Sequence, residues 1–173
     1  QEHVRITHDI LSKIADKSES FKDVVEIASS HHEKYNGDGY FRHKSGDNIP
    51  LGGRILAVAD VFDAITSIRH YRDRMPINQA IGIILDGAGN HFDGKITDIF
   101  LSLGCDKIID VILFNSSTVL GAKDRQILES KNLIQLKEII EKDEKTEEEK
   151  SLIDLFNSYY LSENTAKQEV QVG

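Results

Sequence analysis

Apolar residues recur along this chain with a helical period, and alternation of apolar and polar residues never persists beyond a few positions. Side chains three and four positions apart share one face of an α-helix, whereas a half-buried strand has a period of two. Helices are predicted over residues 20–33, 54–66, 77–87, 94–103, 107–114, 124–141 and 151–161, after a helical stretch that starts near Val4. The pattern therefore predicts an all-α fold.

The helix predicted over residues 54–66 is apolar nearly all round, which is typical of a buried helix. Asp60 and Asp63 lie three positions apart on one face of it. A buried carboxylate needs an arginine, a set of N–H donors or a cation as its partner. Arg54 or Arg69 could be that arginine. Alternatively, Asp60 binds a metal and Asp63 supports it, which explains the same burial.

Composition and charge exclude several classes of function. The chain has 21 Lys and Arg against 29 Asp and Glu, a net charge of −8 that argues against a binder of DNA or RNA polymers. No apolar run reaches the roughly 18 residues of a membrane-spanning helix, and the sequence starts without a signal-peptide pattern. The single cysteine, Cys105, excludes a disulfide framework and suits a reducing compartment. A cytoplasmic location is therefore expected.

All 7 histidines lie between positions 3 and 91, so the chemistry is expected in the first half of the chain. His31 and His32 end the helix predicted over residues 20–33 and are followed by Glu33. Two adjacent side chains diverge by about 100° on a helix, so one metal rarely takes both and two metals side by side could. The alternative is one exposed histidine and one hydrogen-bonded core histidine.

Two further features lie near these groups in the sequence. Residues 34–52 form a long glycine-rich loop in which Tyr40 offers an aromatic face and a hydroxyl, and a loop of this length is usually functional. The basic residues Arg69, His70, Arg72 and Arg74 follow the 54–66 helix. Guanidinium groups match phosphate oxygens, although such a cluster alone is often an exposed loop. Read together, these features indicate a metal-dependent phosphoester hydrolase.

The residues from His31 to Tyr40 read HHEKYNGDGY, which resembles the HHExxDGxGYP motif of the HD-GYP phosphodiesterases. The resemblance continues in order through IPL from Ile49, RILAVADVFDA from Arg54, SIRHYR from Ser67 and GNHFD from Gly89. It covers about residues 1–103. The departures are Asn36 for the usual acid, Phe41 for the proline of GYP, Ile68 for an acid and His70 for a proline.

The resemblance implies an HD-type helical bundle over residues 1–103. Residues 104–173 are then a helical extension, with an acidic segment and a polar tail, that packs on the core or pairs with another copy in a homodimer. It also implies two or three divalent metal ions, iron or manganese, and a cyclic dinucleotide substrate, chiefly cyclic di-GMP, cut to a linear dinucleotide or GMP in bacterial signalling. Carried over by position, the metal ligands are His3, His31, His32 and Asp60, with Glu33 and Asp63 behind them, and the substrate contacts are Tyr40, Arg69 and Arg72. His31, His32 and Asp60 are the expected catalytic residues.

The His-Asp pair that names the family lies upstream of the position of His3, so the chain is expected to be a fragment that begins after it. Residues 1–173 alone are therefore expected to have little activity. Two functions stay open. An active phosphodiesterase is favoured by the intact His31, His32 and Asp60. A regulatory module that binds a cyclic dinucleotide, or a signalling protein such as a GGDEF-type cyclase, is favoured by the departures after Tyr40.

Overall fold

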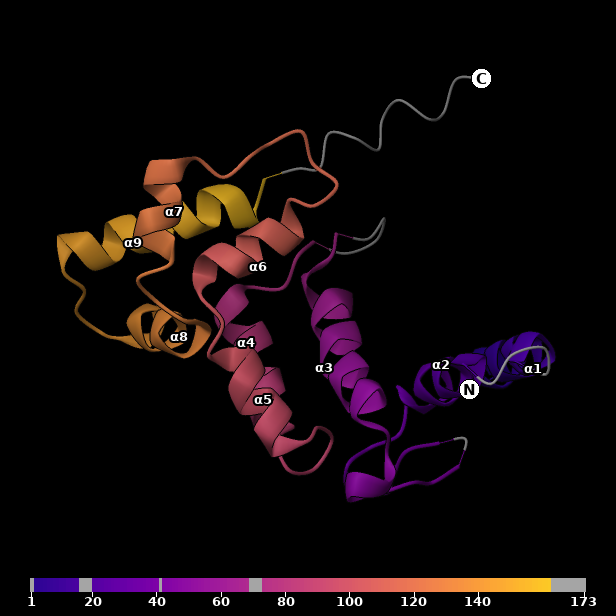
Figure 1. Cartoon of the computed structure of the whole chain (residues 1–173). Helices are drawn as coiled ribbons and strands as arrows, with labels where there is room; N and C mark the ends of the chain where they lie inside the picture. The colour runs from indigo at the N-terminus through magenta and orange to yellow at the C-terminus, as the bar shows by residue number, and fades with distance from the viewer. Residues whose placement is uncertain (1, 16–19, 41, 69–72, 163–173) are drawn as a thin grey trace. The chain divides into compact units, whose positions relative to one another are not determined.

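The computed structural model describes residues 2–15, 20–40, 42–68 and 73–162. Within these ranges the chain forms helices and no strand, which confirms the all-α prediction (Figure 1). The helices are α1 (Glu2–Ala15), α2 (Ser20–Ser30), η1 (Gly46–Asn48), α3 (Leu51–Thr66), α4 (Ile77–Asp86), α5 (Gly94–Leu101), α6 (Cys105–Ile112), α7 (Ala122–Leu128), α8 (Leu133–Glu141) and α9 (Glu147–Tyr160). None of the described helices is long and apolar enough to cross a bilayer.

The helices group into two compact units that alternate along the chain. The first unit contains Gln1–Ile65 and Gly82–Phe100, and the second contains Thr66–Ile81 and Leu101–Gly173. The first unit holds α1, α2 and nearly all of α3, and the second holds α6 to α9. The boundary predicted after residue 103 separates the region that resembles the family from the C-terminal extension, and it stays a prediction.

Two glycines bring the first turn of α3 against the end of α2. A Cβ on Gly52 would lie 2.9 Å from the side chain of Ile27, and a Cβ on Gly53 would lie 2.9 Å from Cβ of Ser30. Because these distances are shorter than a real Cβ contact, a larger residue would push the two helices apart. The glycines thus fix the start of α3 beside the chain segment that follows α2.

The apolar helix α3 is buried on one side only, which corrects the prediction of a helix enclosed on all sides. Ala57, Val58 and Phe62 are buried, whereas Ile55 and Leu56 are 47% and 42% exposed. Asp60 and Asp63 lie on the exposed side. The two carboxylates therefore marked this side in the sequence, although the apolar residues around them favoured full burial.

The second unit buries the apolar side chains of its C-terminal helices. Leu133, Leu136 and Ile139 of α8 and Leu152 and Phe156 of α9 are all buried. α9 contacts α6, α7 and α8. The two roles predicted for residues 104–173, packing on the core and pairing with another copy, both stay predictions.

The single helix predicted over residues 124–141 is two helices, α7 and α8. Asn132 begins α8 with a capping box in which its side-chain oxygen accepts from Gln135 N at 2.9 Å. In return, Gln135 Oε1 accepts from Asn132 N at 3.1 Å. These reciprocal bonds satisfy backbone donors at a helix start, and the apolar period alone does not reveal such a start inside a longer pattern.

Replacing Asn132 with alanine should lower the free energy of unfolding by about 1 kcal/mol, because alanine cannot accept the hydrogen bond from Gln135 N. Urea unfolding of the two proteins measures the difference. Ser151→Ala, an exposed change inside α9, is the matched control and should stay within about 0.5 kcal/mol of the wild type. Equal effects of the two substitutions would show that the capping box contributes no stability.

Candidate functional site

The two adjacent histidines lie in a turn and not at the end of a helix. α2 ends at Ser30, and Glu33 N donates to Ser30 O at 3.0 Å, so His31 and His32 are the central residues of that turn. The helix predicted over residues 20–33 therefore ends early. In this turn the two imidazoles lie close together, with ring centroids 4.1 Å apart and ring planes tilted by 41°. The predicted divergence of the two rings was wrong for this reason.

A backbone contact fixes the tautomer of His31. Its Nδ1 lies 2.6 Å from Ala28 O. A carbonyl oxygen only accepts, so Nδ1 carries the hydrogen and the lone pair of the neutral ring is on Nε2. Histidines that bind metals are commonly oriented by such a bond to a carbonyl. The local structure of this turn therefore suits a histidine ligand.

Tyr40 joins this pair of histidines to α3. Its ring stacks on the ring of His32 with centroids 5.0 Å apart, and Tyr40 N donates to His32 O at 3.4 Å. Burial raises the pKa of the Tyr40 hydroxyl, and the negative charge of Asp60 raises that pKa further. Asp60 therefore lies close enough to Tyr40 for its charge to act on the hydroxyl. His31, His32 and Tyr40 are thus in contact, and the charge of Asp60 acts on the Tyr40 hydroxyl.

Glu33 closes the loop that carries Tyr40. The residue is only 2% exposed, its Oε1 accepts from Arg42 N at 2.7 Å, and its Oε2 is buried without a hydrogen-bond partner. Gly39 crosses directly over the same backbone, where a Cβ would lie 2.4 Å from Glu33 Cα and from Lys34 N. A buried carboxylate oxygen without a donor is rare and suits a nearby cation or water.

The first residues of this loop are fastened to the segment between α4 and α5. Tyr35 N donates to His91 O at 3.0 Å, and Asn36 N donates to Asn90 O at 2.9 Å. The Asn36 amide also donates to Asn90 Oδ1 at 2.5 Å and to Asp38 Oδ2 at 2.7 Å. An ionised carboxylate at position 36 could not donate these bonds. Asparagine at position 36, where the family motif has an acid, therefore suits the two oxygen acceptors that its amide binds.

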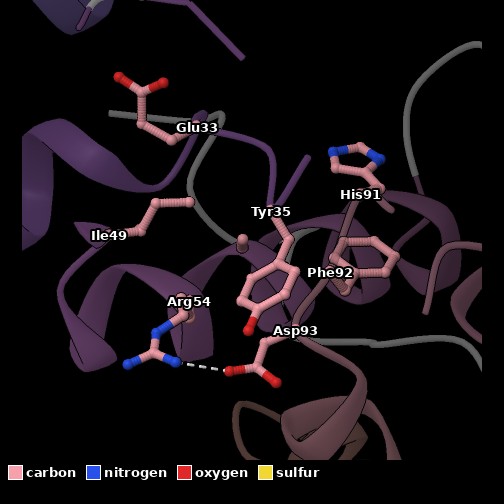
Figure 2. A pocket seen from close by; sticks show the side chains of 8 residues that line it. Glu33, Tyr35, Ile49, Arg54, His91, Phe92 and Asp93 are labelled. Carbon is pink, nitrogen blue, oxygen red and sulfur yellow. Dashed lines mark hydrogen bonds and ion pairs between the residues drawn. The ribbon is translucent and has the colours of Figure 1, made fainter. Parts of the chain in front are cut away.

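A small polar pocket lies behind the loop, and Figure 2 shows Tyr35 pointing into it toward Arg54 and Asp93. Its lining residues are Glu33, Tyr35, Ile49, Arg54, Ala57, His91, Phe92 and Asp93. Arg54 Nη1 binds both Asp93 Oδ2 and Asp47 Oδ1 at 2.7 Å. The pocket has a volume of about 10 Å³, roughly the space of one water molecule and far less than the roughly 300–1,000 Å³ of pockets for small ligands. We therefore interpret it as a support of the loop.

Replacing His91 with glutamine should make the melting temperature less sensitive to pH between 7 and 5. Burial lowers the pKa of His91, and the charge of Lys34 lowers it further. The unfolded chain therefore binds the proton at higher pH than the folded chain. The stabilisation of the folded state by neutral His91 is complete above the ordinary histidine pKa of about 6.5 and is lost as the pH falls through the folded pKa.

Lys34→Gln removes only the second cause of the lowered pKa, so the slope of its melting temperature against pH should be intermediate. Parallel curves for wild type and His91→Gln would contradict this assignment.

The structure places the other predicted site residues as follows. Asp60 and Asp63 are exposed, so the predicted burial of this pair was wrong, and Arg54 pairs with Asp47 and Asp93 instead. The side chain of His3 and residues 69–72, which include Arg69 and Arg72, lie outside the described part of the chain. Among the described residues, no group of three His, Cys, Asp or Glu side chains is arranged to hold a metal ion.

Sequence reasoning missed the residues that hold the loop in place. Arg42, Asn90 and Asp93 each contact a partner at least nine positions away in the chain. Their partners come from other segments, and no local pattern marks them. The run GNHFD from Gly89 to Asp93 was a signal for two of them, because it matches the family motif as a block.

Comparison with known proteins finds matches to the first part of the chain. The HD domain family matches residues 1–96. A cyclic di-GMP phosphodiesterase of Vibrio cholerae is 41% identical over 107 residues, which are 60% of this chain and 22% of that protein. A 3'3'-cGAMP-specific phosphodiesterase of the same species is 39% identical over 101 residues, 58% of this chain and 19% of that protein. A cyclic di-GMP phosphodiesterase of Thermotoga maritima is 36% identical over 103 residues, 60% of this chain and 27% of that protein. The chain thus spans about a fifth to a quarter of the length of these relatives.

Proposed function

The chain belongs to the HD domain family, and from this premise we propose that the complete protein is a metal-dependent phosphodiesterase that hydrolyses a cyclic dinucleotide. The resemblance to the HD-GYP phosphodiesterases is confirmed by relatives that carry this activity in their names. Cyclic di-GMP is the substrate we propose, with a linear dinucleotide or GMP as the product. The observation that carries the proposal is the contact of His31, His32 and Tyr40 beside Asp60.

The donors in this part of the chain are of the types that divalent metal ions bind, although the described side chains do not form a group of three arranged around one point. The lone pair on His31 Nε2, the imidazole of His32 and the carboxylate of Asp60 are ligand types that iron and manganese accept. Glu33 Oε2 is buried without a hydrogen-bond partner, so a cation close to it would give it one. We propose that His3, His31, His32 and Asp60 hold two or three such ions, with Glu33 and Asp63 supporting them. The ions would supply Lewis-acid stabilisation of the charge on the phosphate.

The remaining residues would bind and orient the dinucleotide. Tyr40 is partly buried, and its ring stacks on His32. We propose that this ring packs against the substrate, as aromatic rings do against bases. Arg69 and Arg72 are the proposed phosphate contacts, because guanidinium groups bind phosphate oxygens in pairs.

A second candidate function is a regulatory module that binds a cyclic dinucleotide without cutting it. It is favoured by the observation that no group of three metal-ligand side chains is preformed among the described residues. Such a module would bind the same nucleotide class through Tyr40 and the arginines. It would transmit the binding event to a signalling partner, such as a GGDEF-type cyclase.

One assay separates the two functions. The purified protein is incubated with cyclic di-GMP or 3'3'-cGAMP and Mn²⁺ or Fe²⁺, and the products are separated by chromatography. Hydrolysis that stops with a chelator and returns with metal is the result expected of the phosphodiesterase. Binding of the dinucleotide in calorimetry without hydrolysis would identify the regulatory module. Neither binding nor hydrolysis would contradict both functions.

A further inference from the structure

Three adjacent basic residues, Arg42, His43 and Lys44, lie shortly after Tyr40 and are called the basic segment below. Glu33 Oε1 accepts the hydrogen bond from Arg42 N at 2.7 Å. Glu33 also directly follows His32, and the ring of Tyr40 stacks on the ring of His32. The basic segment therefore starts at a fixed place next to the histidine turn, inside the first compact unit.

A single carboxylate holds the two cations of the basic segment. Arg42 Nη1 lies 2.5 Å from Glu26 Oε2, and Lys44 Nζ forms an ion pair with Glu26 Oε1. The side chains of Arg42, Lys44 and Glu26 are 37%, 28% and 30% exposed, so all three are open to solvent. Arg42 and Lys44 therefore bring two cationic side chains to one place, beside the carboxylate of Glu26 and the buried carboxylate of Glu33. They lie in a chain whose net charge is −8.

The backbone of the basic segment is held in an unusual conformation. His43 has a φ of 53°, and it is the non-glycine residue with positive φ in the part of the chain that the structure describes. Its side chain is exposed. Such a conformation persists only where the surroundings enforce it, and it is common at binding sites. Here the residues on both sides of His43 are tied to Glu26, which holds the histidine outward.

We propose that the basic segment is an anion subsite that contacts a phosphate of the cyclic dinucleotide; this inference rests on the proposed function and adds a contact to it. Arg42 Nη1 binds Glu26 and Arg42 Nη2 lies 3.4 Å from His8 Nε2, so a phosphate would share these donors or replace their partners. Lys44 adds a compact charge. Each phosphodiester has two non-bridging oxygens, so one phosphate accepts bonds from several cationic side chains. An acidic protein repels an anion at long range, so the attraction must come from local cations.

Variants that remove a positive charge and a variant that removes a negative charge distinguish this role from one in which Arg42 and Lys44 only neutralise Glu26. Arg42→Gln and Lys44→Gln each remove one positive charge and should weaken the binding of cyclic di-GMP by roughly threefold to tenfold. Glu26→Gln keeps both cations and removes their competing partner, so it should strengthen binding by roughly the same factor. Lys137→Gln is the matched control, because Lys137 also pairs with one glutamate, Glu141, but lies in α8 of the second unit.

Calorimetric titration of the purified protein with cyclic di-GMP measures these affinities, and a melting curve checks the folding of each variant. Opposite changes for Lys44→Gln and Glu26→Gln, both reduced at high salt and absent in Lys137→Gln, are the expected result. If the wild type binds and the three variants near Glu26 bind equally well, the basic segment is not a subsite and the proposed function stands. If the wild type does not bind cyclic di-GMP, the proposed function fails and the subsite fails with it.

Discussion

Replacing His32 with alanine should release the bound divalent metal and lower the hydrolysis of cyclic di-GMP by at least roughly 100-fold. Loss of a residue that only supports a metal ligand already reduces metal affinity or activity by about 10- to 100-fold, and His32 is proposed as a ligand itself. Alanine also removes the ring on which Tyr40 stacks. One substitution therefore affects both the metal and the orientation of the substrate.

Metal analysis after dialysis, together with the hydrolysis assay, measures this effect. Tyr40→Phe is the matched control, because phenylalanine keeps the ring over His32 and removes only the hydroxyl. It should retain the metal while its activity falls less. A His32→Ala protein that melts like the wild type and keeps its metal would show that His32 is not a ligand.

The sequence predicted that His31, His32 and Tyr40 act together, and their rings are in contact in the structure. The sequence did not predict their geometry. The motif indicated that these residues act together, because several blocks occur in order over residues 1–103. It did not reveal that α2 ends at Ser30, since the apolar period continues to His32 and no glycine or proline interrupts it. The close contact of the two imidazoles lies in the turn that follows this helix end, where Glu33 N donates to Ser30 O.

Contacts between distant segments were beyond the reach of sequence reasoning. Asn36 binds Asn90 across 54 positions, and Arg54 binds Asp93 across 39. Polar residues in loops are common, and their spacing carries no information about which of them meet. The exposed position of Asp60 has a similar cause, because it depends on which side of α3 the neighbouring elements cover. Periodicity predicts that a helix has faces, while packing decides which face is covered.

Replacing Gly39 with alanine should lower the free energy of unfolding by about 2–3 kcal/mol and reduce hydrolysis at least about tenfold. The added Cβ would lie 2.4 Å from Glu33 Cα and Lys34 N, which are backbone atoms that cannot rotate away. The loop must then move as a whole. That movement would break the bond from Arg42 N to Glu33 and separate Tyr40 from His32.

Gly94→Ala is the matched control for this prediction, because the nearest atom to its added Cβ is Gly89 N at 3.7 Å, an ordinary contact. It should change the stability by no more than about 0.5 kcal/mol and leave the hydrolysis unchanged. Chemical unfolding and the hydrolysis assay on both variants test the pair. If Gly39→Ala unfolds like Gly94→Ala and remains active, the close crossing of the loop is not required, and Tyr40 must be positioned by its stack on His32 alone.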